Sequence, residues 1–315
     1  MKHIFIKASL LVFAALTFSA CSGDDDNGPE SSGINIPEID DECCNEEETF
    51  LAYTFLTNGF VGEIESLREQ VDGKYELRVY SAAGKLHVGY NDLYFSLTKL
   101  SNGGYVRDFD ITDITPLMTM TGGMSMQHST PIGPNAVVHD KTFPAVRRAW
   151  VSFLMSSGDN GYWDLAYTLE KEGSKWRKED TRIVVDPLAE PRVWIKSFKV
   201  GNDTFYLSLA NASDFRTGNN VIKAYVSKVG TDRKQPYLLA PERFTIDIYP
   251  TMPDMGNHSS PGNEALTLQP DGSYEGRLNL SMTGTWDIHL HVKDAEGNSV
   301  AGEEGLSELF WTVVI

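Results

Sequence analysis

Short apolar runs separated by turn residues fill the chain from residue 49 to its end. Residues 75–81, 92–97 and 148–155 are typical runs, rich in aromatic and β-branched side chains. A 3.6-residue period is nearly absent, so the pattern indicates strands rather than helices. It predicts an all-β fold of sandwich or barrel type, with residues 62–70 open between a short helix and a loop. Further strands are expected at 163–169, 182–185, 192–200, 204–210, 221–226, 244–249, 273–281, 286–292 and 309–315.

The strand pattern occurs twice, which indicates two copies of one unit. Residues 75–91 align without a gap with residues 204–220, so that two Gly-x-Asn turns coincide. We predict tandem β-sandwich domains at 49–186 and 192–315, joined by a proline-containing linker at 187–191. The matched positions are Gly89 and Gly218, Asn91 and Asn220, His128 and His258, Met155 and Met282, and Trp163 and Trp286.

The first residues have the features of a secretion signal. Lys2 and Lys7 precede an apolar run at 8–18, and Ser19-Ala20-Cys21 follows. This arrangement predicts a lipoprotein signal peptide at 1–20 rather than a transmembrane helix. Ser-Ala-Cys resembles a bacterial lipobox, which implies that Cys21 is lipidated and that the lipid holds the chain at a membrane. The expected location is the outer membrane, facing the cell surface or the periplasm.

An acidic flexible tether is expected at 21–48. It begins with Asp24, Asp25 and Asp26 and is similar to the export tether of surface lipoproteins in some Gram-negative bacteria. Cys43 and Cys44 lie within it. A bond between adjacent cysteines strains the peptide between them, so we expect tether residues without a role. An intermolecular disulfide or a soft-metal thiolate pair remains open. The predicted domains contain no other cysteine, hence no disulfide framework.

The formal charge of −17 limits the classes of molecule that the chain is expected to bind. Such an acidic surface argues against nucleic acid and against anionic membrane surfaces. It is compatible with cation binding, although solubility explains it as well.

Methionine is concentrated in two similar segments, 118–131 and 252–261. Apart from the initiator, all eight methionines lie there or at Met155 and Met282, whereas methionine used as core filler is scattered. Both segments are rich in Gly, Pro and Ser and end in His-Ser-x-Pro, so we expect irregular loops.

Thioether and imidazole groups together suit Cu(I), whereas zinc requires Cys or several His with a carboxylate. One predicted site consists of Met252, Met255, His258 and Met282. The other consists of Met124, Met126, His128 and Met155, with Met118 or Met120 in reserve. The alternative is a hydrophobic plug that closes the end of each sandwich. Copper is the only cofactor that the sequence suggests.

The second copy carries a family resemblance. Met252-Pro-Asp-Met255-Gly-Asn-His258 is followed by Asp271-Gly-Ser-Tyr-Glu-Gly276 and by Met282-x-Gly284-x-Trp286. Over residues 215–294 this resembles the YtkA-like/FixH-like domain. The first copy is more divergent, because it lacks the proline between the methionines and the Asp-Gly-x-Tyr-x-Gly segment. The resemblance implies immunoglobulin- or cupredoxin-like sandwiches and copper handling outside the cytoplasm. It also marks the second copy as the better-formed site.

The remaining histidines give weaker signals. His289 and His291 alternate along one strand, where they either chelate Cu(II) or Zn(II) or form a solvated face. His87 and His139 are expected at the surface or in turns.

No catalytic motif occurs, and we predict that the chain is not an enzyme. Two hypotheses follow. The first is a lipid-anchored, non-catalytic Cu(I)-binding protein that serves a copper-handling partner. The second is a surface adhesion or complex-forming module that binds a protein partner without metal.

Overall fold

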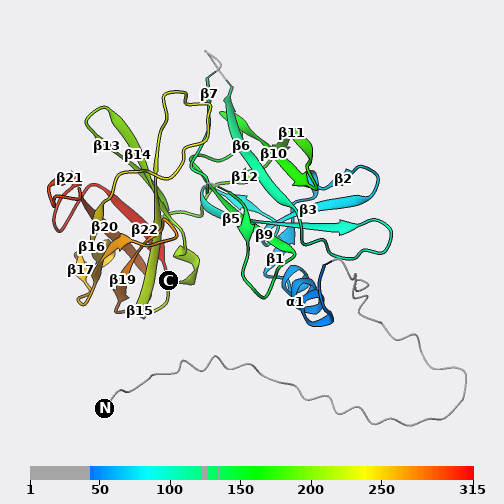
Figure 1. Cartoon of the computed structure of the whole chain (residues 1–315). Helices are drawn as coiled ribbons and strands as arrows, with labels where there is room; N and C mark the ends of the chain where they lie inside the picture. The colour runs from blue at the N-terminus through cyan, green and yellow to red at the C-terminus, as the bar shows by residue number, and fades with distance from the viewer. Residues whose placement is uncertain (1–42, 122–125, 134) are drawn as a thin grey trace, which may run out of the picture. The chain divides into compact units, whose positions relative to one another are not determined.

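Antiparallel β-structure dominates the chain (Figure 1). The computed structural model describes residues 43–121, 126–133 and 135–315. The predicted all-β class is confirmed, since one α-helix and three short 3₁₀ turns accompany the strands in this part of the chain. The predicted signal peptide and Cys21 lie outside the described residues.

Two sheets form the first sandwich. One has the order β1-β3-β5-β9-β8 with β2 beside β3, and the other has the order β11-β10-β6-β7. Phe95, Phe153 and Trp163 are fully buried between them. Residues 62–70 form parts of β1 and β2 around the 3₁₀ turn η1. The bounds are β1 Val61–Glu63, η1 Glu65–Leu67, β2 Glu69–Val71, β3 Tyr75–Ala82, β4 Leu86–His87, β5 Gly89–Lys99, β6 Asp110–Met120, β7 Gln127–His128, β8 Val137–Val138, β9 Val146–Phe153, β10 Gly161–Lys171, β11 Ser174–Ile183 and β12 Val185–Asp186.

A ten-stranded sheet forms the second sandwich. Its order is β13-β14-β15-β19-β18-β16-β20-β21, with β17 beside β16 and β22 beside β20. Because β18 pairs with both β19 and β16, it joins the two layers into a near-barrel. Trp286 and Trp311 fill its core. The bounds are β13 Ile195–Val200, β14 Asp203–Leu209, η2 Ala212–Asp214, β15 Gly218–Lys228, β16 Thr245–Met252, η3 Pro253–Met255, β17 His258–Ser259, β18 Glu264–Leu268, β19 Tyr274–Leu280, β20 Thr285–Lys293, β21 Ser299–Gly302 and β22 Phe310–Val314.

The two sandwiches repeat the same strand register. Gly89 at the start of β5 pairs with Phe153 at the end of β9, and Gly218 at the start of β15 pairs with Leu280 at the end of β19. Both glycines have a positive φ, +88° and +95°, which L side chains rarely adopt. This register agrees with the alignment of the two sequence copies.

Asn91 and Asn220 hold the same loop in the two sandwiches. The Asn91 amide nitrogen donates to the main-chain oxygens four and two positions earlier, at 2.7 and 2.8 Å. The corresponding distances at Asn220 are 2.7 and 2.9 Å. Each amide oxygen also accepts a bond of 2.9 Å from the main-chain N–H four positions earlier. Gly-x-Asn is therefore a loop clamp in both copies.

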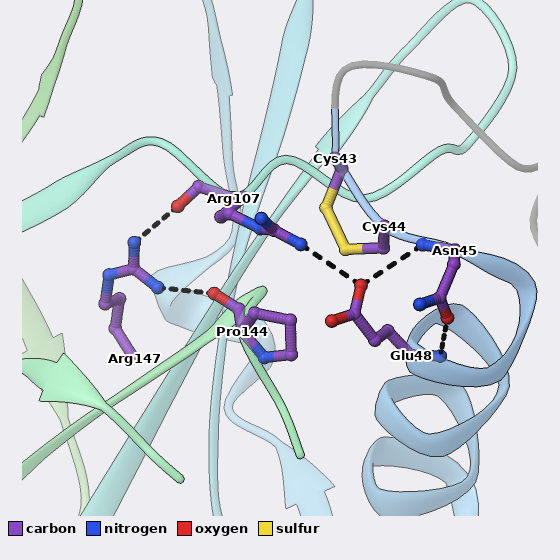
Figure 2. The surroundings of a disulfide bond; sticks show 7 residues. All are labelled: Cys43, Cys44, Asn45, Glu48, Arg107, Pro144 and Arg147. Atoms are coloured by element: carbon purple, nitrogen blue, oxygen red, sulfur yellow. Dashed lines mark hydrogen bonds and ion pairs between the residues drawn. A yellow bond between two sulfur atoms is a disulfide. The ribbon is translucent and has the colours of Figure 1, made fainter. Parts of the chain in front are cut away.

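A helix begins inside the segment expected to be tether. Helix α1 spans Glu46–Thr57 and packs Ala52 and Leu56 against the first sandwich. Its start has a capping box: the Glu48 N–H donates to Asn45 Oδ1 at 2.9 Å, and the Asn45 N–H donates to Glu48 Oε2 at 3.1 Å. Arg107 Nη2 donates to the same carboxylate at 3.1 Å (Figure 2). The acidic run thus belongs to a helix N-terminus, where negative charge is stabilising.

Cys43 and Cys44 form a disulfide with each other, and both are buried beside this helix (Figure 2). The expectation of unpaired tether cysteines was wrong. The two side chains belong to an apolar cluster that contains Ala52, Tyr80 and Val146. Their burial depends on packing against residues distant in the chain, which the local sequence does not reveal.

The two sandwiches are joined by more than residues 187–191. The linker follows β12, which pairs with β4, and includes a cis Glu190–Pro191 bond. Main-chain hydrogen bonds also cross the junction: the Ser129 N–H donates to the Arg233 oxygen at 2.7 Å, and the Tyr237 N–H donates to the Thr130 oxygen at 3.1 Å. The segment after His128 is thereby tied to the second sandwich.

Candidate functional site

Both methionine-rich segments contain paired strands, where irregular loops were expected. In the first, β6 pairs with β7 and places Met118 opposite His128. In the second, β16 pairs with β17 and places Met252 opposite His258. Met118, rather than Met124, is therefore the structural counterpart of Met252. Met124 itself lies outside the described residues.

Met118 and Met252 fill equivalent positions in the two cores. Their exposed fractions are 0% and 4%. A Cβ at Gly161 would lie 2.7 Å from the Met118 methyl carbon, and a Cβ at Gly284 would lie 2.7 Å from that of Met252. The two thioethers thus pack tightly over glycines, as the hydrophobic-plug alternative expects.

Met155 and Met282 share a main-chain role. The buried Trp163 indole N–H donates to the Met155 carbonyl oxygen at 2.8 Å. The Trp286 indole N–H donates to the Met282 carbonyl oxygen at 3.0 Å. Each bond gives a buried indole N–H its acceptor. The side chains of Met155 and Met282 are half-buried against their cores.

Three predicted ligands of the first copy line one cavity. Met126, His128 and Met155 border a space of about 260 Å³. Met126 and His128 come from the hairpin, and Met155 from the turn after β9. The opposite wall belongs to the second sandwich and consists of Thr204, Tyr206, Val229, Arg233 and Tyr237. Sequence reasoning missed this wall, because no local pattern connects it to the hairpin.

His128 is held with one ring nitrogen free for a ligand. Its Nδ1 lies 2.8 Å from the Ser129 carbonyl oxygen, which only accepts, so the proton is on Nδ1 and the Nε2 lone pair is available. The ring stands edge-on to Trp163, with centroids 5.5 Å apart. Ser129 is buried, and its hydroxyl donates to the Pro116 oxygen at 2.6 Å. This fixed tautomer is the form that binds metals.

Neutral donors dominate the electrostatics of the cavity. The lining residues include no carboxylate, and Arg233 contributes a positive charge. Burial raises the pKa of Tyr237 to about 12, so this phenol stays neutral at physiological pH. Across the described ranges, no three His, Cys, Asp or Glu side chains gather as a metal group. A hard cation finds no oxygen cage here, whereas thioethers and imidazole suit a soft one.

The second hairpin does not gather its predicted ligands in the same way. Met255 and His258 are exposed at its tip, beside the left-handed residues Gly256 and Asn257, while Met252 is buried. The motif that matches the family pattern better is therefore the more open of the two.

His289 and His291 do not form a free chelating pair or a solvated face. His289 is buried, with Nδ1 2.7 Å from the Ser307 carbonyl oxygen and Nε2 3.0 Å from the Thr251 hydroxyl. The Nε2 of His291 lies 2.9 Å from the Ser299 hydroxyl. Neither the chelating pair nor the solvated face is formed, because β21 and the segment before β22 cover this part of β20.

Comparison with known proteins does not add an activity. No protein-family model and no curated protein matches the sequence. One similar solved structure is the conserved domain protein from Bacillus anthracis, 11% identical, with 81% of this chain and 91% of that chain covered and a TM-score of 0.24. At that score the likeness carries no argument. In the part of the chain that the structure describes, no helix is long and apolar enough to cross a membrane.

Proposed function

We propose that this protein is a lipid-anchored, extracytoplasmic, non-catalytic Cu(I)-binding protein whose site is the cavity beside the first hairpin. The observation that carries the proposal is the convergence of Met126, His128 and Met155 on that one cavity. His128 supplies Nε2, and the two methionines supply thioether sulfur. Soft sulfur ligands with imidazole select Cu(I) over the harder divalent ions.

Charge favours the same ion. Arg233 repels a divalent cation about twice as strongly as a monovalent one, because Coulomb energy is proportional to charge. The absence of carboxylates from the lining leaves nothing to offset that repulsion. Lipidation at Cys21 and the acidic segment behind it would keep the site at the outer membrane, within reach of a copper-handling partner. The YtkA-like resemblance of the second copy supports this assignment.

A competition titration with a Cu(I) chelator tests the proposal. The variant Met126→Leu/His128→Gln/Met155→Leu removes the three donors and nearly preserves side-chain volume. We expect its Cu(I) affinity to fall by roughly 100-fold, or about 2.8 kcal/mol. The matched control, Met255→Leu/His258→Gln, changes exposed residues of the second hairpin and is expected to bind like the wild type. Equal affinity in the triple variant and the wild type would contradict the proposal.

One observation favours the second candidate, a surface module that binds a protein partner. Strand β8 lies at the edge of its sheet, and its Val137 and Val138 are both exposed. An exposed apolar edge strand can pair with a strand of another protein. If the wild-type protein binds no Cu(I) in the titration, this candidate replaces the first.

A further inference from the structure

A second cavity of about 260 Å³ lies where helix α1, strands β1 and β5 and the start of the second sandwich meet. It is lined by five aromatic side chains, Phe55, Phe60, Tyr90, Tyr94 and Trp194. Phe60 is 80% exposed at its rim, unusual for so large an apolar side chain with no partner to cover it. The volume is at the lower end of small-molecule sites, roughly 300 Å³, and suits one ring-sized ligand.

The carboxylate of Asp92, the charged group among the lining residues, is already paired. Tyr90 and Tyr94 hydroxyls donate to the two oxygens of Asp92, at 2.8 and 3.3 Å. Arg148 donates to the same carboxylate from Nε at 2.8 Å and from Nη2 at 3.1 Å. A cationic ligand would find the carboxylate already paired, and an anionic ligand would find the guanidinium already paired. The cavity therefore suits a neutral molecule.

Two polar groups in the wall still lack partners within the described ranges. The Trp194 Nε1 is buried without a hydrogen bond. The Nδ1 of His87 lies 2.8 Å from the Val88 carbonyl oxygen, so Nδ1 carries the proton and Nε2 is an acceptor. The two rings meet edge to face, with centroids 5.3 Å apart. The wall thus holds the His87 acceptor and, covered beside it, the unpaired Trp194 donor. A hydroxyl group can match both because it accepts and donates.

We infer that this cavity binds a neutral saccharide. A sugar ring offers C–H faces to aromatic rings and hydroxyls to the Trp194 and His87 nitrogens. Trp194 Nε1 is covered, so its bond to a sugar hydroxyl requires the indole to turn when the sugar binds. This site is separate from the copper site and does not depend on it.

The test uses the full-length protein and the indole N–H signals of its six tryptophans. Glucose, galactose, mannose, N-acetylglucosamine and their common disaccharides are titrated to about 50 mM, which detects millimolar dissociation constants. Trp194→Phe assigns the Trp194 signal. We expect at least one sugar to shift that signal saturably and to leave the Trp286 signal unchanged. No saturable shift with any of these sugars would overturn the inference.

Variants locate the binding. Phe60→Ser removes the exposed ring at the rim, and we expect binding that is roughly 2- to 10-fold weaker. Trp194→Phe keeps an aromatic face and removes the N–H donor. We expect this variant to bind the sugar roughly 2- to 10-fold more weakly than the wild type, measured by calorimetry. Phe50→Ser is the matched control, since Phe50 is an exposed phenylalanine on helix α1 that does not line the cavity. Sugar binding unchanged in Phe60→Ser and Trp194→Phe would contradict the assigned site, as would tighter binding of indole than of any sugar.

Discussion

His139 shows how a single residue departs from its sequence expectation. It was expected at the surface or in a turn; it lies in the bend after β8, half-buried, and packs among three aromatic rings. The centroid distances are 4.8 Å to Phe55, 5.0 Å to Tyr94 and 5.3 Å to Phe143. Burial in this cluster, helped by the nearby charge of Arg148, lowers the pKa of His139. The neighbours Asp140 and Asp92 oppose the shift without cancelling it.

The lowered pKa predicts acid sensitivity. An unfolded histidine has a pKa of about 6.5, so protonation favours the unfolded chain below that value. The stabilisation is complete above about pH 6.5 and is lost as pH falls through the lower folded-state pKa. His139→Phe keeps the aromatic packing and cannot be protonated. We expect its urea midpoint to fall less than that of the wild type between pH 7.5 and pH 5. His258→Phe, at an exposed position, is expected to follow the wild type, and an equal fall in all three proteins would disprove this account.

The asparagine clamps make a second prediction at this scale. Asn220→Ala breaks the four hydrogen bonds of this side chain and leaves main-chain groups without partners, which costs about 1–3 kcal/mol. Asn91→Ala, at the buried equivalent position, is expected to cost at least as much. Urea denaturation measures both, with Asn219→Ala as the control because Asn219 is exposed on the same strand. A loss no larger than that of the control would show that the clamps do not stabilise the loops.

Among the elements, the strands were predictable and the helix was not. Short runs of apolar, aromatic and β-branched residues between turn signals marked most of the strands that flank the cores, because strands buried in a core favour these residue types. Strand β6 was missed, since Asp110 and Asp113 at one end and Met118 and Met120 at the other hide its alternation. Helix α1 was missed because the three successive glutamates in its first turn were interpreted as part of the tether.

The capping box predicts the effect of one substitution on α1. Asn45→Ala removes the acceptor for the Glu48 N–H and is expected to cost about 1 kcal/mol. Hydrogen exchange of the first-turn amides of α1 measures how often this turn opens. Asn45→Ser restores an acceptor and is expected to exchange like the wild type. Exchange in Asn45→Ala that is no faster than in the wild type would show that the cap does not hold the helix.

At the scale of the whole molecule, the sequence singled out three residues that line one cavity, but not how that cavity is formed. His128, Met126 and Met155 were named from their types and spacing. The sequence motif favoured the second hairpin as the better-formed site. A family pattern describes which residues are present and does not describe whether they are buried. The wall that completes the first cavity, with Tyr206 and Arg233, comes from the other sandwich. It follows from the junction between the sandwiches, which no local pattern encodes.

X-ray absorption at the copper edge tests the central claim most directly. The full-length protein is loaded with one equivalent of Cu(I), and the neighbours of the ion are counted in the wild type and in His128→Gln. We predict two sulfur neighbours and one imidazole nitrogen in the wild type, with the imidazole signal lost in His128→Gln and kept in His258→Gln. An imidazole signal that persists in His128→Gln, or a wild-type shell without sulfur, would contradict the account.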